Sequence, residues 1–230
     1  MKRGISLSVV VLAYDEEAAL ERVVLDLLAY LPGRVEKFEI IIVDDGSRDG
    51  TAAICSRLAA GHPAVRAITH AENRGLPRAA KTGYREARCA YVIWIEGDGQ
   101  FLVPDLERFL ELVPRHTVVA SWRQRRDYSL ARRCVSAGYN FLLSLLFDLK
   151  IRDAGSVIML KRGIVDEAEL ISDGVTVSAE LLLRAKGKGH DIGQCPRTFV
   201  PRMAGTSRIF GLREILHGIG DLLRLYRSAL

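Results

Sequence analysis

Four short apolar runs punctuate the first hundred residues of the chain. They are residues 7–14 (LSVVVLAY), 38–43 (FEIIIV), 65–70 (VRAITH) and 90–96 (AYVIWIE). Their length, their β-branched and aromatic residues and their polar flanks are typical of buried β-strands. Three stretches with apolar residues at helical spacing separate them: 15–31, 49–60 and 76–88. This strand–helix alternation predicts an α/β fold with a mostly parallel sheet, covered by helices on both faces.

The alternation becomes less regular after Asp98. Helices are predicted over 104–113 and 128–149, strands over 117–122, 156–161 and 191–200, and a last amphipathic helix over 211–228. No linker-like stretch interrupts the chain, so a single domain over residues 1–230 is expected.

Charge and cysteine content narrow the choice of partners and compartment. The 230 residues carry a net charge of +5, which favours an anionic partner such as a phosphate, a lipid surface or nucleic acid. The four cysteines include no CxxC pair, so reduced thiols in the cytoplasm are expected rather than a zinc site or disulfides. The longest apolar run, FLLSLLF at 141–147, is far shorter than the roughly 20 residues of a membrane-spanning helix. Any membrane association is therefore expected to be peripheral.

Acidic residues follow two of the predicted strands. Asp44 and Asp45 come directly after the run at 38–43, and Glu96 and Asp98 lie at the end of the run at 90–96. Ligands of open parallel sheets bind beyond the carboxyl ends of the strands, so these carboxylates are expected at one crevice. Clustered carboxylate oxygens suit a hard divalent cation, Mg²⁺ or Mn²⁺, that holds phosphates. Carboxylates at this place could also accept hydrogen bonds from a ribose or a base.

Glycines accompany these carboxylates. Gly46, Gly97 and Gly99 would let the backbone approach a ligand closely. The alternative interpretation is that the DGS and GDG segments are only turns, since Asp, Gly and Ser all favour turns. Two such acidic loops after two buried strands favour a site.

Several longer segments, in their order along the chain, resemble a known family. The segments are VVVLAYDEEAAL, EIIIVDDGSRDGT, NRGLPRAAKTG, VIWIEGDGQFLVPDL, RDAGSVIMLKR, SAELLLRAKGKGHDIGQCP and RMAGTSR. They resemble the family 2 glycosyltransferases of the GT-A fold and, within them, polyprenyl-phosphate sugar transferases such as the dolichyl-phosphate mannose synthases. The resemblance implies a Rossmann-like mixed, mostly parallel sheet flanked by helices. It also implies a nucleotide-sugar-binding half, 1–100, and an acceptor-binding half, 101–230.

The resemblance assigns roles position by position. It places in the nucleotide-sugar pocket Leu12, Tyr14, Glu16, Asp44, Asp45, Gln100 and Ser207. It assigns the metal ion to Glu96, Asp98 and Gln100, and the acceptor phosphate to Arg123, Arg132 and Ser136. The implied catalytic residues are Asp98, Arg202, Arg208 and Glu180.

The implied reaction is an inverting, metal-dependent hexosyl transfer from a nucleotide-sugar to polyprenyl or dolichyl phosphate. The donor would be of the GDP-mannose or UDP-glucose type, and Mg²⁺ or Mn²⁺ would neutralise the leaving diphosphate. An anionic phosphate acceptor needs positioning, whereas a hydroxyl acceptor needs a general base, for which Asp98 and Glu180 are the candidates. Two alternatives stay open: a family 2 enzyme that glycosylates a glycan or small-molecule hydroxyl, and a non-catalytic sugar-nucleotide-binding protein.

Other features bear on these alternatives. Glu96 stands where the resemblance leads us to expect Asp, which motivates the non-catalytic alternative. No binding motif of interleaved basic and aromatic residues accompanies the basic cluster at 123–133, so no nucleic-acid partner is expected. The five histidines show no metal-ligand spacing and are expected to be structural or exposed. The expected location is the cytoplasm, peripherally at the cytoplasmic face of a membrane.

Overall fold

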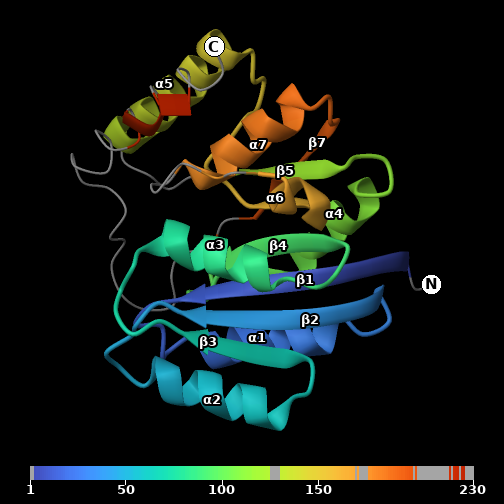
Figure 1. The fold of residues 1–230 in the computed structure, drawn as a ribbon, viewed down its shortest axis with the longest axis vertical. Coiled ribbons are helices and arrows are strands. Elements are labelled where there is room, and N and C mark those ends of the chain that lie inside the picture. The colour runs from blue at the N-terminus through green and yellow to red at the C-terminus, as the bar shows by residue number, and fades with distance from the viewer. Residues whose placement is uncertain are drawn as a thin grey trace.

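The computed structural model describes residues 3–124, 130–168, 170, 176–198, 200, 218, 220–222 and 224–225, with residues 3 and 130–132 described by their backbone alone. Its strands form one seven-stranded sheet in the order β3-β2-β1-β4-β6-β5-β7 (Figure 1). The strands are β1 (Arg3–Ala13), β2 (Val35–Asp44), β3 (Val65–Thr69), β4 (Tyr91–Glu96), β5 (Val118–Arg123), β6 (Ile158–Lys161) and β7 (Ile192–Arg197).

The sheet is mixed and mostly parallel. Strand β1 pairs in parallel with both β2 and β4, β2 pairs in parallel with β3, and β5 pairs in parallel with β7. Strand β6 is antiparallel to its two neighbours, β4 and β5. The predicted fold class is therefore confirmed.

Helices cover both faces of this sheet. They are α1 (Leu20–Tyr30), α2 (Thr51–Gly61), α3 (Leu76–Glu86), α4 (Leu106–Leu112), α5 (Leu130–Phe147), α6 (Arg162–Asp166) and α7 (Val177–Gly187), with a short 3₁₀ helix at Val103–Asp105. One core cluster joins α1, α2 and α4 to one face, and a second joins α3, α5, α6 and α7 to the other. No helix in the described ranges combines the length and the apolar character that crossing a bilayer requires.

The apolar run at the start of the chain explains this two-sided packing. Val9 and Val11 of β1 belong to the first cluster, whereas Val10 and Leu12 belong to the second, and all four side chains are buried. A strand buried on both faces reads as a continuous apolar run, which is the signature of a central parallel strand.

Several predicted boundaries differ from the structure. Helix α1 begins at Leu20 instead of residue 15, because residues 14–19 form turns that contact the loop after β2. Strands β1 and β2 begin earlier than predicted, at Arg3 and Val35. Helices α6 and α7 were not predicted. Most of the predicted helix at 211–228 lies outside the described residues, and its described positions are helical.

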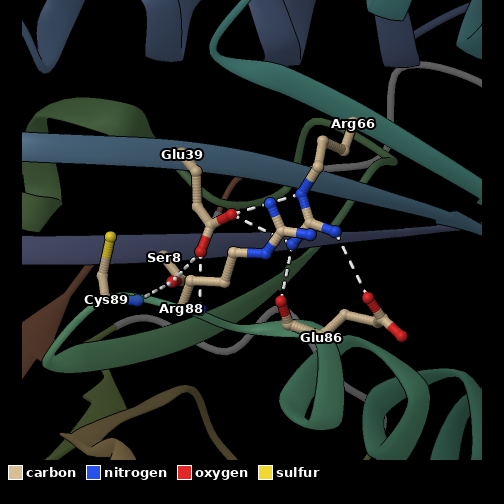
Figure 2. Close-up of polar contacts among 6 residues, drawn as sticks. All are labelled: Ser8, Glu39, Arg66, Glu86, Arg88 and Cys89. Atoms are coloured by element: carbon tan, nitrogen blue, oxygen red, sulfur yellow. Dashed lines mark hydrogen bonds and ion pairs between the residues drawn. The ribbon is translucent and has the colours of Figure 1, made fainter.

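A polar network holds α3 against the strands beside it, and Figure 2 shows Glu39 at its centre. Glu39 accepts hydrogen bonds from Ser8 Oγ at 2.7 Å and from the Arg88 backbone N–H at 2.6 Å, and it forms an ion pair with Arg66 at 3.0 Å. Arg66 also contacts Glu86 at the end of α3, at 3.2 Å. Burial alone would raise the pKa of Glu39, but the hydrogen bonds from Ser8, Arg88 and Arg66 outweigh it and hold that pKa below 4.5.

The substitution Glu39→Gln tests this network. It is expected to lower the free energy of unfolding by about 1–2 kcal/mol near neutral pH, because a neutral amide replaces a charged acceptor of several donors. Since folding lowers the pKa of Glu39, its contribution is complete above pH 4.5 and is lost as the pH falls through the folded pKa. Urea denaturation of both proteins should therefore show a difference that shrinks as the pH falls below 4.5.

Glu36→Gln is the matched control, because Glu36 lies exposed on the same strand. It is expected to change stability by less than about 0.5 kcal/mol. Equal effects of the two substitutions would show that the network does not stabilise the fold.

Candidate functional site

The carboxyl ends of six strands meet at one edge of the sheet. This follows because β4 and β5 are both antiparallel to β6 and therefore parallel to each other, which gives every strand but β6 the same direction. The chain places β2 and β3 on one side of β1 and then crosses to β4 on the other side. Such a change of direction creates a crevice at the carboxyl ends of the two strands involved, β1 and β4.

The loops after β1 and β2 are tied together by reciprocal hydrogen bonds. The Asp15 backbone N–H donates to Ser47 Oγ at 3.0 Å, and the Arg48 backbone N–H donates to Asp15 Oδ1 at 2.9 Å. The same pattern recurs between Glu16 and Thr51, between Glu17 and Asp49, and between Gly50 and Glu17. Much of the SRDGT segment therefore builds the loops. The predicted pocket residues Tyr14 and Glu16 lie in the first of them.

Asp44 lies beneath the turn that follows β2. Its side chain is fully buried, and its Oδ1 accepts a hydrogen bond from the Ser47 backbone N–H at 3.0 Å and another from the Ser47 hydroxyl. Its Oδ2 is buried and has no hydrogen-bond partner among the described residues. Burial, together with the Asp44 charge, raises the pKa of the nearby Cys55 thiol to about 12, so this thiol stays protonated and unreactive.

The Asp45 side chain lies on the other face of the sheet and accepts hydrogen bonds from three donors. Its Oδ1 accepts from His70 Nδ1 at 2.7 Å and from the Arg74 backbone N–H at 3.0 Å, and its Oδ2 accepts from the Gly75 backbone N–H at 2.7 Å. Asp45 therefore holds the loop between β3 and α3. Its predicted contact with a base or ribose stays a prediction.

Gly46 packs against the same loop instead of leaving space for a ligand. Its φ is +72°, and a Cβ added there would lie 2.5 Å from the Glu72 carbonyl carbon and 2.8 Å from the Asn73 nitrogen. Only glycine fits a left-handed turn at this distance from a neighbouring backbone.

The end of β4 brings the predicted metal residues to the crevice. Leu12 of β1 is opposite Glu96, and the Leu12 carbonyl accepts a hydrogen bond from the Gly97 N–H at 2.8 Å. Asp98 is almost fully buried, and its Oδ1 accepts from the Gln100 backbone N–H at 2.9 Å. The Gln100 side-chain Nε2 donates to the Val200 carbonyl at 3.1 Å and thereby links this loop to the segment after β7.

The carboxylates of Glu96 and Asp98 fit a hard divalent cation. In the described ranges, no group of three or more His, Cys, Asp or Glu side chains is placed to hold a metal by itself. Mg²⁺ is commonly held by one or two carboxylates together with substrate phosphates, and not by an all-protein cage. Glu96 and Asp98 supply two carboxylates within three residues of one strand end. A cation there would need a phosphate ligand to complete its coordination.

Basic residues lie on the second part of the same edge. Arg123, at the end of β5, forms a bidentate ion pair with the buried Asp153, with N–O distances of 2.8 and 3.0 Å. Arg197, at the end of β7, donates to Ser156 Oγ at 3.1 Å, and that hydroxyl is 2.9 Å from Ser121 Oγ. Arg123 was predicted to bind an acceptor phosphate, and the structure shows that Asp153 fixes its guanidinium.

The remaining predicted residues are not all brought to this edge by a described contact. In α5, the Ser136 carbonyl accepts a hydrogen bond from Asn140, and Arg132 is described by its backbone alone. Glu180 is fully buried in α7 and forms an ion pair with Arg184 at 2.7 Å. Arg202, Ser207 and Arg208 lie outside the described residues, so their roles stay predictions.

Sequence reasoning did not assign a role to three polar residues, of which His70 and Arg197 are buried and Thr82 is half-buried. His70 was grouped with the other histidines, and Thr82 and Arg197 were not singled out. Their partners lie 12 to 41 residues away along the chain. Local sequence patterns contain no signal for contacts at such separations.

Comparison with known protein families identifies the family of this chain. The model of the family described as "Glycosyl transferase family 2" matches residues 8–166, which include the carboxyl-terminal half of β1, all of β4 and both acidic loops. The chain belongs to glycosyl transferase family 2. It is therefore an enzyme of the glycosyltransferase class, as the resemblance implied.

Curated relatives of this glycosyltransferase match most of its length. A dolichol-phosphate mannosyltransferase of Mycosarcoma maydis is 29% identical, with 96% of this chain and 79% of the relative covered. One of Saccharomyces cerevisiae is 26% identical, with coverages of 97% and 88%. A human dolichyl-phosphate beta-glucosyltransferase is 31% identical over 167 residues, which are 64% of this chain and 52% of the relative.

Solved structures share the fold of this glycosyltransferase. Glucosyl-3-phosphoglycerate synthase from Mycobacterium tuberculosis, in complex with Mn²⁺, UDP-glucose and phosphoglyceric acid, has a TM-score of 0.75 at 18% identity. The match covers 97% of this chain and 80% of that one. The same enzyme with Mg²⁺ and UDP has a TM-score of 0.66 at 16% identity, with coverages of 97% and 76%.

The substitution Gly46→Ala tests the packing of the two loops. It is expected to lower the free energy of unfolding by about 2–5 kcal/mol, because a left-handed alanine costs about 1–2 kcal/mol and overpacking costs about 1–3 kcal/mol more. The control is Gly33→Ala, because Gly33 has a φ of +82° but nothing within 4 Å of its added Cβ. Thermal unfolding that shows equal losses for both variants would contradict the close packing of Gly46 on the loop.

Proposed function

We propose that this glycosyltransferase moves a hexose from a GDP-mannose or UDP-glucose type donor to a polyprenyl or dolichyl phosphate, with inversion at the anomeric carbon. The observation that carries the proposal is the likeness to two dolichol-phosphate mannosyltransferases over nearly the whole chain. The likeness extends past the donor-binding strands, so it includes the half proposed to bind the acceptor, residues 101–230. Residues 1–100 are proposed to bind the donor.

The crevice between β1 and β4 is the proposed donor site. Tyr14 and Glu16 follow β1, and Asp98 and Gln100 follow β4, so they lie on both sides of it. The diphosphate is proposed to lie beside Asp98, where Glu96, Asp98 and the Gln100 side chain would hold Mg²⁺ or Mn²⁺. A bound cation of this kind would offset the charge that develops on the leaving diphosphate.

Two later arginines are proposed to assist departure of the diphosphate. Arg202 and Arg208 would add fixed positive charge near the leaving group, with Ser207 as a hydrogen-bond donor between them in sequence. The bond between the anomeric carbon and the diphosphate oxygen breaks, and its electron pair leaves with the nucleoside diphosphate.

The acceptor phosphate is proposed to bind near Arg123, Arg132 and Ser136. A phosphate oxygen attacks the anomeric carbon as an anion, so no proton has to be removed from it, and positioning supplies the catalysis. The bidentate ion pair with Asp153 supports this role for Arg123, because it holds the guanidinium in one orientation at the shared edge. The ion pair between Glu180 and Arg184 weighs against Glu180 as a general base for a hydroxyl acceptor.

Helix α5 supports a lipid acceptor as well. Its outer face exposes large apolar side chains: Val135, Phe141, Leu142, Leu145 and Leu146. Phe141 and Leu145 are the most exposed of them, at 65% and 66%. An apolar helix face next to the acceptor positions suits peripheral contact with a membrane surface, which is proposed to be the cytoplasmic face.

Asp98→Asn tests the donor site. It is expected to lower transfer by about 10²- to 10³-fold, because the loss of one well-placed charge at the leaving group typically costs that much. Transfer of radiolabelled sugar from GDP-mannose and UDP-glucose to polyprenyl phosphate would be measured with Mn²⁺, with Mg²⁺ and after chelation. Glu96→Asp is the control that keeps both carboxylates, and it is expected to stay active. Full activity of Asp98→Asn, or of the chelated wild type, would count against the proposed site.

Arg132→Ala tests the nature of the acceptor. It is expected to lower transfer to polyprenyl phosphate by about a hundredfold, since a charge-assisted contact with the nucleophile would be lost. Its neighbour in α5, Arg133, is exposed, and Arg133→Ala is the matched control with little expected effect. If both variants kept wild-type transfer to the lipid, or if the wild type glycosylated hydroxyl acceptors without lipid, the acceptor proposed here would be wrong.

A further inference from the structure

A line of three hydrogen-bonded side chains runs from the end of β2 through the end of β3 to α3, with Asp45 and His70 buried and Thr82 half-buried. His70 contacts Asp45 Oδ1 through Nδ1 at 2.7 Å and Thr82 Oγ1 through Nε2 at 3.0 Å. Because a carboxylate only accepts hydrogen bonds, Nδ1 carries a proton and donates it to Asp45. His70 is 8% exposed and Asp45 is 3% exposed, so solvent does not replace the contact between these two side chains. We call Asp45, His70 and Thr82 the β2–α3 clamp.

The clamp fixes the loop that separates β3 from α3. Asp45 accepts the Arg74 and Gly75 backbone N–H groups at the far end of this loop, at 3.0 and 2.7 Å. At the near end, the His70 backbone N–H donates to the Asp44 carbonyl at 2.9 Å. Asp44, the last residue of β2, therefore holds one end of the loop through its backbone carbonyl. Asp45, the next residue, holds the other end through its side chain.

The middle of the loop presents polar side chains at the carboxyl edge of the sheet. Glu72, Asn73 and Arg74 are exposed there, directly after β3 and beside the end of β2. Gly46 packs against the backbone of Glu72 and Asn73, so the middle of the loop lies directly against the turn that follows β2. An amide and a guanidinium on a rigid loop can read the N–H and C=O groups at the edge of a nucleobase.

We propose that His70 is a positioning residue for the nucleoside part of the donor, and that it acts by holding Asp45 and the Glu72–Arg74 loop as one wall of the pocket. This inference rests on the proposed function, since it assumes a nucleotide in the crevice. A buried hydrogen bond between polar side chains adds only modest net stability, because both groups lose their contacts with water on burial. The clamp instead removes conformational freedom that the loop would otherwise lose when a nucleoside binds.

Binding measurements separate this role from a purely structural one. Calorimetry with GDP, UDP and inorganic pyrophosphate, each with Mn²⁺, would be done on the wild type and on His70→Ala. The variant is expected to bind whichever nucleoside diphosphate the wild type binds about tenfold more weakly, and pyrophosphate with unchanged affinity. Pyrophosphate lacks the nucleoside, so a general loss of structure would weaken it as well.

Three further variants complete the test. His70→Asn places an amide N–H near the Nδ1 position and is expected to restore most of the nucleoside binding, because it keeps the bond to Asp45. Thr82→Val removes only the outer hydroxyl of the clamp, is expected to weaken binding about threefold, and replaces His70→Ala in the test if that variant does not fold. His116→Ala is the matched control. His116 contacts Asp191 at 2.6 Å, and both residues lie at the amino ends of β5 and β7, at the edge of the sheet opposite to the crevice.

The outcomes discriminate between the two proposals. Wild-type affinity for the nucleoside diphosphate in both His70→Ala and Thr82→Val would overturn the role of His70 and leave the proposed function standing. An equal loss for pyrophosphate would also overturn it. Failure of the wild type to bind GDP or UDP with Mn²⁺ would overturn the proposed function, and the role of His70 with it.

Discussion

Strand β1 is hydrogen-bonded to β2 on one side and to β4 on the other, and all three strands run in the same direction. Three loops, at 14–17, 45–51 and 97–100, therefore leave the sheet side by side. This central position requires a strand that is apolar on both faces, because helices cover it from both sides. The apolar sequence of β1 therefore places this strand at the centre of the sheet and the loop after it at the crevice.

Buried carboxylates hold the loop after β2, the loop between β3 and α3 and the loop after β4. Asp44 accepts the Ser47 backbone N–H, Asp45 accepts those of Arg74 and Gly75, and Asp98 accepts that of Gln100. A buried carboxylate is costly unless donors compensate it, and backbone N–H groups do so while their own hydrogen-bonding needs are met. The acidic residues that mark the site in the sequence therefore also determine the shape of its loops. Glu96 and Asp98 are the pair that we propose to hold a cation.

The sequence predicts the parts of this protein that depend on local pattern. The strands from β1 to β5 could be located from their sequence patterns, and the edge that carries Asp44, Asp45 and Asp98 follows from their order. Helix α7 escaped prediction because it is buried almost all round, so its sequence shows no polar face. The ion pair between Arg123 and Asp153 and the contact between Asp45 and His70 join residues 30 and 25 positions apart, and only the folded chain brings them together.

The loop between β3 and α3 is fastened mainly through its main chain. The groups that Asp45 accepts at its far end are the amide N–H groups of Arg74 and Gly75, which every residue type except proline possesses. The identities of the side chains at 72–74 are therefore not constrained by the anchor. With the role proposed for this loop, these side chains, and with them the preferred nucleobase, can change without remodelling the sheet. The backbone N–H groups of the loop attach it to the sheet, whereas its side chains are free to change with the donor.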